Sequence, residues 1–416
     1  MANPAAVIAP MVTLSHIESA LVRIRKSIHV SPCTRSEAFS DLTGNSIFLK
    51  LENRQRTGAY KERGALNKLL SLTPEERSQG VIAASAGNHA QAVAYHASNL
   101  DIRARIVMPL ATPLIKVSAT RGYGGEVVLH GANYDEAYEE AIRQSTQDHL
   151  TFVHAFDDEA VIAGQGTLGL ELLEQHPDLE AVVVPIGGGG LIGGVSCALK
   201  ENNPRIQVIG VQPARLPSLK VALAQGQPVT LPPAVTIADG IAVRRAGERT
   251  LPLVRKYVDD IVTVEEEEIA NAVLLLLERE KILAEGAGAA ALAALVNRRI
   301  PMIRDKTGKK IVVVVSGGNI DVTLLARIIE RGLVKDGRLV RLRVHLPDYP
   351  GALHRLTGIL AQHRANIVET SYDRAYHNVN LGDTAIDITM ETRGPDHIAE
   401  LISALGDNGY THERIL

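Results

Sequence analysis

The sequence predicts an α/β protein of two domains, a larger one over residues 1–334 and a smaller one over residues 338–416. Short apolar runs rich in Val and Ile alternate with helical patterns along the larger domain. These runs do not alternate polar with apolar residues, as expected for strands of a sheet that is covered on both faces. After about Val334 the pattern changes, and a strand with alternating residues begins a different arrangement.

Alternation of strands and helices is typical of an α/β protein with mostly parallel sheets. The expected strands of the larger domain are, in chain order, GVIAAS, RARIVMP, GEVVLHG, LTFVHAF, LEAVVVPI, IQVIGV and KKIVVVVS. The helical patterns between them include NHAQAVAYHAS, NYDEAYEEAIRQS, GQGTLGLELLEQ and EEEEIANAVLLLLEREKIL.

Several helix starts can be placed from capping residues. In LTPEER, Thr73 can cap the helix, Pro74 suits its first position and Glu76 can complete a capping box. The segment SHIE, residues 15–18, offers the same box for the first helix. The acidic run of residues 265–268 resembles a metal site but is explained more simply as a first turn that complements the helix dipole.

The smaller domain begins with the strand RLVRLRVHLP and a turn that contains Pro350 and Gly351. An amphipathic helix, the strands NIVETSYD and TAIDITME, the helix DHIAELISALGDNG and a short terminal segment follow. This βαββαβ order predicts a ferredoxin-like split βαβ sandwich. The segment GLVKDGR is expected to join the two domains.

Composition argues against several classes of function. With 416 residues, 45% of them hydrophobic, the chain can bury at least one large core. A net charge of −3 gives no basic surplus for phosphate backbones, so no nucleic-acid partner is expected. We find no secretion signal and no apolar run of the roughly 20 residues that cross a membrane. Cys33 and Cys197 form no CxxC pair and the histidines no HExxH set, so we expect a cytoplasmic protein without a metal site.

The stretch VVVPIGGGGLIGGVSCALK carries the strongest functional signal. It has the pattern of a buried strand, a glycine loop and a helix. Each ordered glycine costs ~0.5–1 kcal/mol relative to alanine, and a merely structural turn would not need so many. Such a loop brings bare N–H groups and a helix N-terminus against a phosphate. A dinucleotide is an alternative, because Gly188, Gly190 and Gly193 fit GxGxxG, although Gln212 stands where an acid or arginine should meet the ribose.

Further loops form a set with this glycine loop. ASAGNHAQA is a strand that leads through Ser85, Asn88 and His89 into a helix, so that hydroxyl, amide and N–H donors point at an anion. IADGIAV and VVSGGNID place glycines beside polar residues, Ser316 among them, at strand ends where α/β sheets bind ligands. In TGAYKERGA, Lys61 is either a solvated charge on a helix or an amine aimed into a pocket, and these loops favour the pocket.

These motifs resemble those of a known family. AYKERGA, SAGNHAQ, GGGGL, EGAGAAALAAL and SGGNID, in that order and spacing, resemble the threonine dehydratases, also called threonine ammonia-lyases. That family belongs to the pyridoxal-phosphate enzymes of fold type II, the tryptophan synthase β fold with two open α/β subdomains. The tail that contains PDYPGAL resembles an ACT domain, which often binds a regulatory amino acid in this family.

The resemblance implies a role for each matching residue. Lys61 would form a Schiff base with pyridoxal 5'-phosphate, the implied cofactor. The other implied cofactor contacts are Tyr60 and Gly240 at the two ring faces, Asn88 at the ring hydroxyl, Gly187, Gly188, Gly189 and Gly190 at the phosphate, and Ser316 at the pyridine nitrogen. The implied substrate-carboxylate contacts are Ser85, Asn88 and His89. Ala59 departs from the family, which usually has serine at that position.

The implied reaction is an α,β-elimination in which freed Lys61 acts as general base. L-Threonine would give 2-oxobutyrate and ammonia, and L-serine would give pyruvate. A neutral Ser316 partner would leave the pyridine nitrogen unprotonated, so that the cofactor withdraws electrons only weakly. The carbanion would then be short-lived, which favours loss of the β-hydroxyl. The similar serine racemases carry a second serine where this chain has Ala86. Because alanine has no acid or base function, we expect dehydration without appreciable racemisation.

Several alternatives stay open. Serine or 3-hydroxyaspartate could be the preferred substrate, a NAD-dependent dehydrogenase is a rival, and an idle amino-acid sensor is a third reading. The role could be biosynthetic, in isoleucine formation, or catabolic. We expect an effector, isoleucine or valine, near Asp348, Pro350 and Gly351 at a contact between copies in a homodimer or homotetramer. The alternative is that the smaller domain only holds subunits together.

Overall fold

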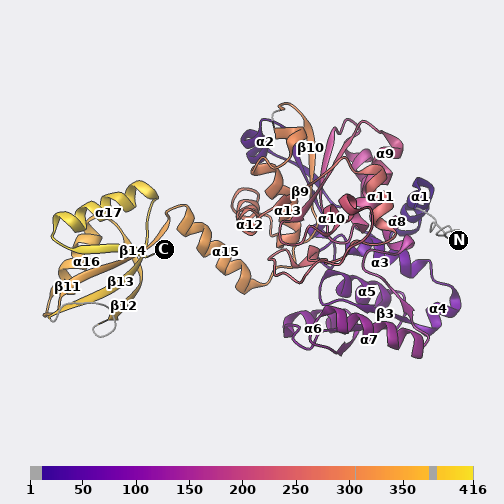
Figure 1. The fold of residues 1–416 in the computed structure, drawn as a ribbon, viewed down its shortest axis with the longest axis horizontal. Helices are drawn as coiled ribbons and strands as arrows, with labels where there is room; N and C mark the ends of the chain where they lie inside the picture. The colour runs from indigo at the N-terminus through magenta and orange to yellow at the C-terminus, as the bar shows by residue number, and fades with distance from the viewer. Residues whose placement is uncertain (1–11, 305, 374–381, 416) are drawn as a thin grey trace. The chain divides into compact units, whose positions relative to one another are not determined.

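A computed structural model describes residues 12–304, 306–373 and 382–415. The chain divides into two compact units, Met1–Asp321 and Val322–Leu416. We call them the first and the second unit, and Figure 1 colours them from indigo to orange and from orange to yellow. This division falls earlier than the domain boundary predicted after Val334, because helix α15 (Val322–Lys335) packs against strand β11 (Leu339–Pro347) of the second unit.

The larger sheet of the first unit has six strands in the order β1-β2-β10-β7-β8-β9. Adjacent strands of this sheet are parallel, except that β1 runs antiparallel to β2. Their bounds are β1 Cys33–Ser36, β2 Ser46–Leu51, β7 Ala181–Pro185, β8 Gln207–Pro213, β9 Asp260–Val264 and β10 Lys310–Val315. Strand β10 is the last strand of the first unit but lies between β2 and β7, so segments far apart in the sequence end side by side at one edge of this sheet.

The smaller sheet of the first unit has four parallel strands in the order β5-β4-β3-β6. Their bounds are β3 Val81–Ala84, β4 Ala104–Met108, β5 Glu126–Leu129 and β6 Thr151–Phe152. Each sheet has its own hydrophobic core. The two open α/β arrangements confirm the predicted fold class of the larger domain.

Helices surround both sheets (Figure 1). Their bounds are α1 Leu14–Ile24, α2 Glu37–Thr43, α3 Lys61–Leu70, α4 Pro74–Gln79, α5 Asn88–Asn99, α6 Leu114–Gly122, α7 Tyr134–Gln147, α8 Glu159–Gln175, α9 Gly190–Asn202, α10 Ser218–Gln225, α11 Thr250–Tyr257, α12 Glu266–Glu280, α13 Gly286–Val296 and α14 Pro301–Arg304, with short 3-10 turns at Glu52–Arg54 and Asp239–Ile241 (η2). Helix α3 contacts both α5 and α8, and α5 contacts strands β3 and β4 of the smaller sheet.

The predicted strands are all present, whereas β1, β2 and β9 were not predicted. Strand β2 contains the buried Lys50, whose charge interrupts the apolar pattern by which buried strands are recognised. The predicted capping box at Thr73 is confirmed. The box predicted at residues 15–18 is wrong, because Thr13 is extended and caps α1, which places Ser15 inside the first turn. Glu265 is the N-cap of α12, and three further glutamates form the acidic first turn that was predicted for residues 265–268.

The second unit has the predicted βαββαβ order. Its elements are β11 Leu339–Pro347, α16 Ala352–Gln362, β12 Asn366–Asp373, β13 Asp383–Glu391, α17 Pro395–Asp407 and β14 Thr411–Ile415. The strands form one antiparallel sheet in the order β12-β13-β11-β14. Its core consists of apolar residues from the sheet and from α16 and α17.

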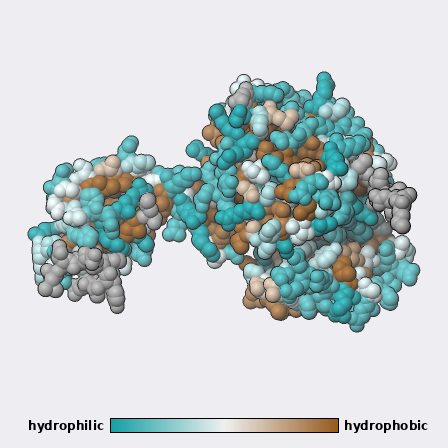
Figure 2. Space-filling model, viewed as in Figure 1, coloured by the Kyte–Doolittle hydropathy of each residue, from teal (hydrophilic) through white to brown (hydrophobic). Residues whose placement is uncertain are grey.

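Hydrophilic residues cover most of the face of the first unit drawn in Figure 2, and hydrophobic residues form separate patches between them. Within the described residues, no helix combines the length and the apolar character needed to span a membrane.

Candidate active site

Lys61 lies at the start of α3 and lines a cleft of about 1090 Å³ in the first unit. Its Nζ donates a hydrogen bond to the carbonyl oxygen of Ala155 at 2.7 Å and lies 5.3 Å from the centroid of the Tyr60 ring. Burial lowers the pKa of Lys61 to about 8, although the nearby Glu285 carboxyl acts in the opposite direction. The side chain is therefore an amine in a pocket and not a solvated surface charge.

The segment before Lys61 is anchored to the end of strand β10. The Tyr60 N–H donates to the carbonyl oxygen of Ser316 at 3.0 Å, and Ala59 forms an isolated bridge with Gly317. Ala59 is fully buried. At this position, where the family usually has serine, the chain therefore places a methyl group in the packed interior. The start of α3 is thereby held beside the C-terminal ends of the parallel strands, where α/β sheets bind ligands.

The predicted glycine loop joins β7 to α9 and opens into a small cavity that Tyr60 and Lys61 also line. Gly189 has φ +99° and caps α9. A Cβ at Gly188 would lie 2.3 Å from the Phe156 ring, and a Cβ at Gly190 would lie 2.7 Å from the Phe156 carbonyl oxygen. Glycine is therefore required at these positions, and the bare loop at the N-terminus of a 13-residue helix suits a phosphate group.

The structure brings the predicted cofactor and substrate residues together. Those that line the large cleft are Tyr60, Lys61, Ser85, Asn88, His89, Gly240 and Ser316. The small cavity, lined by Gly187, Gly188, Gly189 and Gly190, shares Tyr60, Lys61 and Gly240 with that cleft. The lysine, the polar groups and the glycine loop thus fit one ligand that carries a phosphate and a group able to react with an amine.

The ring of His89 is unsuited to binding an anion. It is buried, and its Nε2 lies 2.9 Å from the carbonyl oxygen of Val153, which can only accept, so Nε2 carries the hydrogen. Burial lowers the pKa of His89 to about 3, and the charge of Lys61 acts in the same direction. Its Nδ1 is then an acceptor that cannot bind a carboxylate, which leaves the backbone of His89 as the group available for that purpose.

Two residues that contact the predicted site residue Asn88, Glu285 and Asn319, were not predicted from the sequence. The amide of Asn88 donates to Glu285 Oε1 at 2.7 Å and accepts from Asn319 Nδ2 at 2.8 Å. Burial, followed by the charge of Asp239, raises the pKa of Glu285 to about 7. Both residues stand inside the quoted motifs EGAGAAALAAL and SGGNID, next to glycines, which is the signal that could have found them.

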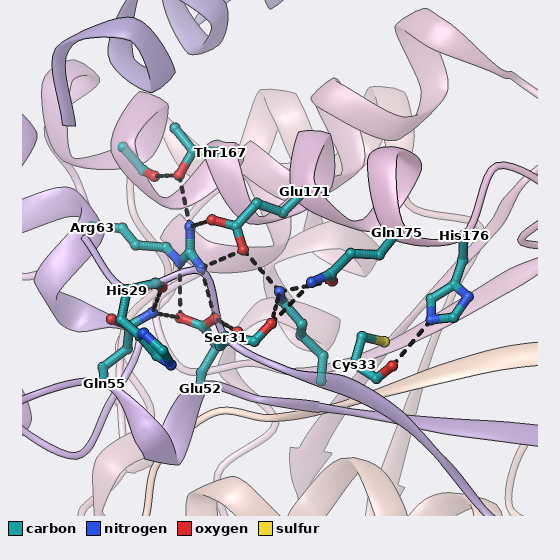
Figure 3. Close-up of polar contacts among 12 residues, drawn as sticks. His29, Ser31, Cys33, Glu52, Gln55, Arg63, Thr167, Glu171, Gln175 and His176 are labelled. Carbon is teal, nitrogen blue, oxygen red and sulfur yellow. Dashed lines mark hydrogen bonds and ion pairs between the residues drawn. The ribbon is translucent and has the colours of Figure 1, made fainter. Parts of the chain in front are cut away.

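Lys50, Glu52, Arg63 and Glu171 form a buried ionic cluster, and Figure 3 shows Arg63 between Glu52 and Glu171. Arg63, two residues after Lys61 on α3, donates to Glu52 through Nε and Nη2, at 2.8 Å each. It also binds both carboxylate oxygens of Glu171 on α8, at 2.7 and 2.8 Å. Lys50 Nζ lies 2.8 Å from Glu171 as well. Burial would raise the pKa of Glu52, but Arg63 holds it below the ordinary value. The cluster fixes α3 against β2 and α8.

Comparison with known proteins supports this arrangement. Residues 24–317 match the family model described as "Pyridoxal-phosphate dependent enzyme". The chain is 48% identical over 400 residues to a protein of Thermotoga maritima named "L-threonine ammonia-lyase", a match that covers 96% of this chain and 98% of that protein.

Solved structures are also similar. Threonine deaminase isoform 2 from Solanum lycopersicum, in its processed form, matches with a TM-score of 0.72 and 36% identity, over 79% of this chain and 98% of that chain. Maize serine racemase matches with a TM-score of 0.73 and 34% identity, over 78% of this chain and 99% of that chain. The chain therefore belongs to the family of pyridoxal-phosphate-dependent enzymes that includes the L-threonine ammonia-lyases.

Proposed function

We propose that the protein converts L-threonine to 2-oxobutyrate and ammonia, and L-serine to pyruvate, in the cytoplasm. The observation that carries this proposal is the buried Lys61 amine, which lines both the large cleft and the adjoining small cavity formed by the glycine loop. The threonine-specific names of relatives that match nearly the whole chain favour this substrate over 3-hydroxyaspartate.

The residues present suit pyridoxal phosphate. Lys61 would hold its carbonyl carbon and Gly187–Gly190 its phosphate. Tyr60 and Gly240 would lie at the ring faces, with Asn88 at the ring hydroxyl and Ser316 at the pyridine nitrogen. The cofactor supplies an electron sink for the electrons released at the substrate α-carbon.

The residues of the chain divide the remaining work. Ser85, Asn88 and the backbone of His89 would orient the substrate carboxylate, which places the α-hydrogen toward Lys61. Once freed from the cofactor, the Lys61 amine would accept that proton as a general base, and burial, which lowers its pKa to about 8, favours the neutral form that this role requires. Ala86 offers no proton on the opposite face, so the reaction proceeds to loss of the β-hydroxyl and not to racemisation.

The test is release of 2-oxo acid by the full chain with added pyridoxal phosphate, from L-threonine, L-serine and 3-hydroxyaspartate. We expect the fastest release from threonine and loss of at least about 1,000-fold in Lys61→Ala, because both attachment and base catalysis depend on this amine. Lys68→Ala removes a lysine of the same helix that pairs with Asp158, and is the matched control. Release from no substrate, or equal release by the two variants, would contradict the proposal.

For the second unit we propose the role of an ACT-type regulatory domain that binds isoleucine or valine. The candidate site is the loop between β11 and α16, which contains Asp348, Pro350 and Gly351. Gly351 has φ +91° and caps α16, and the Arg355 guanidinium lies 4.8 Å from the centroid of the Tyr349 ring. We further propose that these domains meet in a homodimer or homotetramer.

Titration of isoleucine and valine against threonine turnover tests the regulatory role. We expect one of them to change the rate by about 5-fold or more in the full chain, as for ordinary allosteric coupling. Gly351→Val forces a β-branched residue into the left-handed region and should weaken the response while leaving basal turnover unchanged. A flat response to both amino acids in the unmodified chain would remove this proposal.

A further inference from the structure

A directed chain of hydrogen bonds lies beside Lys61 in the cleft. The side-chain nitrogen of Asn319 donates to the carbonyl oxygen of Thr57 at 2.7 Å and to Oδ1 of Asn88 at 2.8 Å. The side-chain nitrogen of Asn88 donates to Glu285 Oε1 at 2.7 Å. The chain thus runs from a backbone carbonyl before α3, across the loop after β10, to the residue that caps α13.

The direction of this chain is fixed, because the groups at both ends are acceptors. The Thr57 carbonyl can only accept, so Asn319 must present its NH2 group to it, and both amide hydrogens are then used. If Asn88 were reversed, its NH2 would face the NH2 of Asn319 and its oxygen would face Glu285. Asn88 therefore keeps one N–H that neither neighbour uses, on a residue that lines the cleft.

Two glycines leave the space that this chain occupies. A Cβ at Gly58 would lie 2.5 Å from Asn319 Oδ1, and Gly58 has φ +77°. A Cβ at Gly317 would lie 2.4 Å from Glu285 Oε1. Any other residue at these positions would displace Asn319 or Glu285, so the backbone on both sides is adapted to hold the two side chains in place.

Glu285 remains an acceptor toward Asn88 in either protonation state, because a carboxyl group keeps an accepting oxygen after it binds a proton. The charged and titratable groups that act on it are Asp239, Lys116, Lys61 and Tyr60. Lys116 lies 2.8 Å from Asp239 and offsets its charge. The orientation of Asn88 is therefore maintained on both sides of neutral pH.

We propose that Asn319 and Glu285 are positioning residues that hold the amide of Asn88 with one N–H donor directed at an oxyanion of the cleft ligand. This inference rests on the proposed placement of the cofactor ring hydroxyl at Asn88. A fixed N–H donor at that point would stabilise the deprotonated ring oxygen, which accepts the hydrogen bond. A protonated ring hydroxyl could not donate its own hydrogen to this N–H group. Without Asn319 or Glu285, Asn88 can rotate and present its oxygen instead.

The test compares Asn319→Ala, Glu285→Ala and Glu285→Gln in the full chain reconstituted with pyridoxal phosphate. The readouts are the cofactor dissociation constant and the visible absorbance of the bound cofactor as a function of pH. We expect about 10-fold weaker cofactor binding and a displaced spectral titration in both alanine variants, from loss of one well-directed hydrogen bond to an anion. Glu285→Gln keeps an acceptor oxygen and should stay within about 3-fold of the unmodified protein.

The matched control is Asn67→Ala. It removes a buried amide that donates to the Ala160 carbonyl oxygen at 2.7 Å and takes no part in the hydrogen bonds between Asn319, Asn88 and Glu285. If both alanine variants behave as this control does in dissociation constant and spectrum, the inference is wrong. A loss in Glu285→Gln as large as in Glu285→Ala would also overturn it, because charge and not orientation would then be responsible. Failure of the unmodified protein to bind the cofactor would instead refute the proposed function.

Discussion

Lys61 shows how a functional side chain opposes folding stability. Its amine is held in a cleft where burial lowers its pKa to about 8, so the charged form is disfavoured in the folded state. A group whose pKa is lower in the folded state binds fewer protons there than in the unfolded chain. The stability of the protein without cofactor should therefore be reduced below about pH 8 and recover as the pH rises toward the ordinary pKa of lysine.

We predict that Lys61→Met stabilises the protein without cofactor by roughly 1–3 kcal/mol at pH 7, because it removes the disfavoured charge. The gain should shrink as the pH is raised from 8 to 10, because the lysine of the folded chain loses its charge over this range and the unfolded chain begins to follow near the ordinary pKa of lysine. Chemical denaturation of both proteins at pH 7 and pH 10 measures the difference. Equal stability of the two proteins at pH 7 would show that Lys61 is fully solvated.

At the scale of elements, helix α3 joins Lys61 to the buried ionic cluster in the protein core. The guanidinium of Arg63 lies between Glu52 and Glu171 (Figure 3), and all three side chains are buried. Such clusters contribute little net stability over apolar packing, but loss of one partner leaves uncompensated buried charges. Here Arg63 joins α3 to Glu52, which follows β2, and to Glu171 of α8.

We predict that Arg63→Met lowers the free energy of unfolding by about 3–5 kcal/mol, because Glu52 and Glu171 are left facing each other without Arg63. Arg35→Met, which breaks the exposed pair with Glu37, should change it by less than about 1 kcal/mol. Denaturant titration of both variants gives the comparison. Similar small effects in both would show that the buried cluster tolerates loss of its central cation.

At the scale of the whole molecule, the sequence allowed the fold class, strands β3 to β8 and β10 of the first unit, and the glycine loop between β7 and α9 to be predicted, whereas β1, β2 and β9 were missed. Those features follow from local periodicity and from glycine's conformational freedom, which a single sequence displays. The ionic cluster could not be predicted, because Lys50, Arg63 and Glu171 meet only after distant segments fold together. Glu285 and Asn319 were missed for the same reason, since their importance depends on their contacts with Asn88.

The most direct test of the central claim is to locate the residue that carries the cofactor. The full chain reconstituted with pyridoxal phosphate would be reduced with borohydride, digested and analysed by peptide mass spectrometry. We predict a pyridoxyl group on Lys61 and none in Lys61→Ala. Modification of another lysine, such as the cleft residue Lys116, or of no lysine at all, would contradict the account.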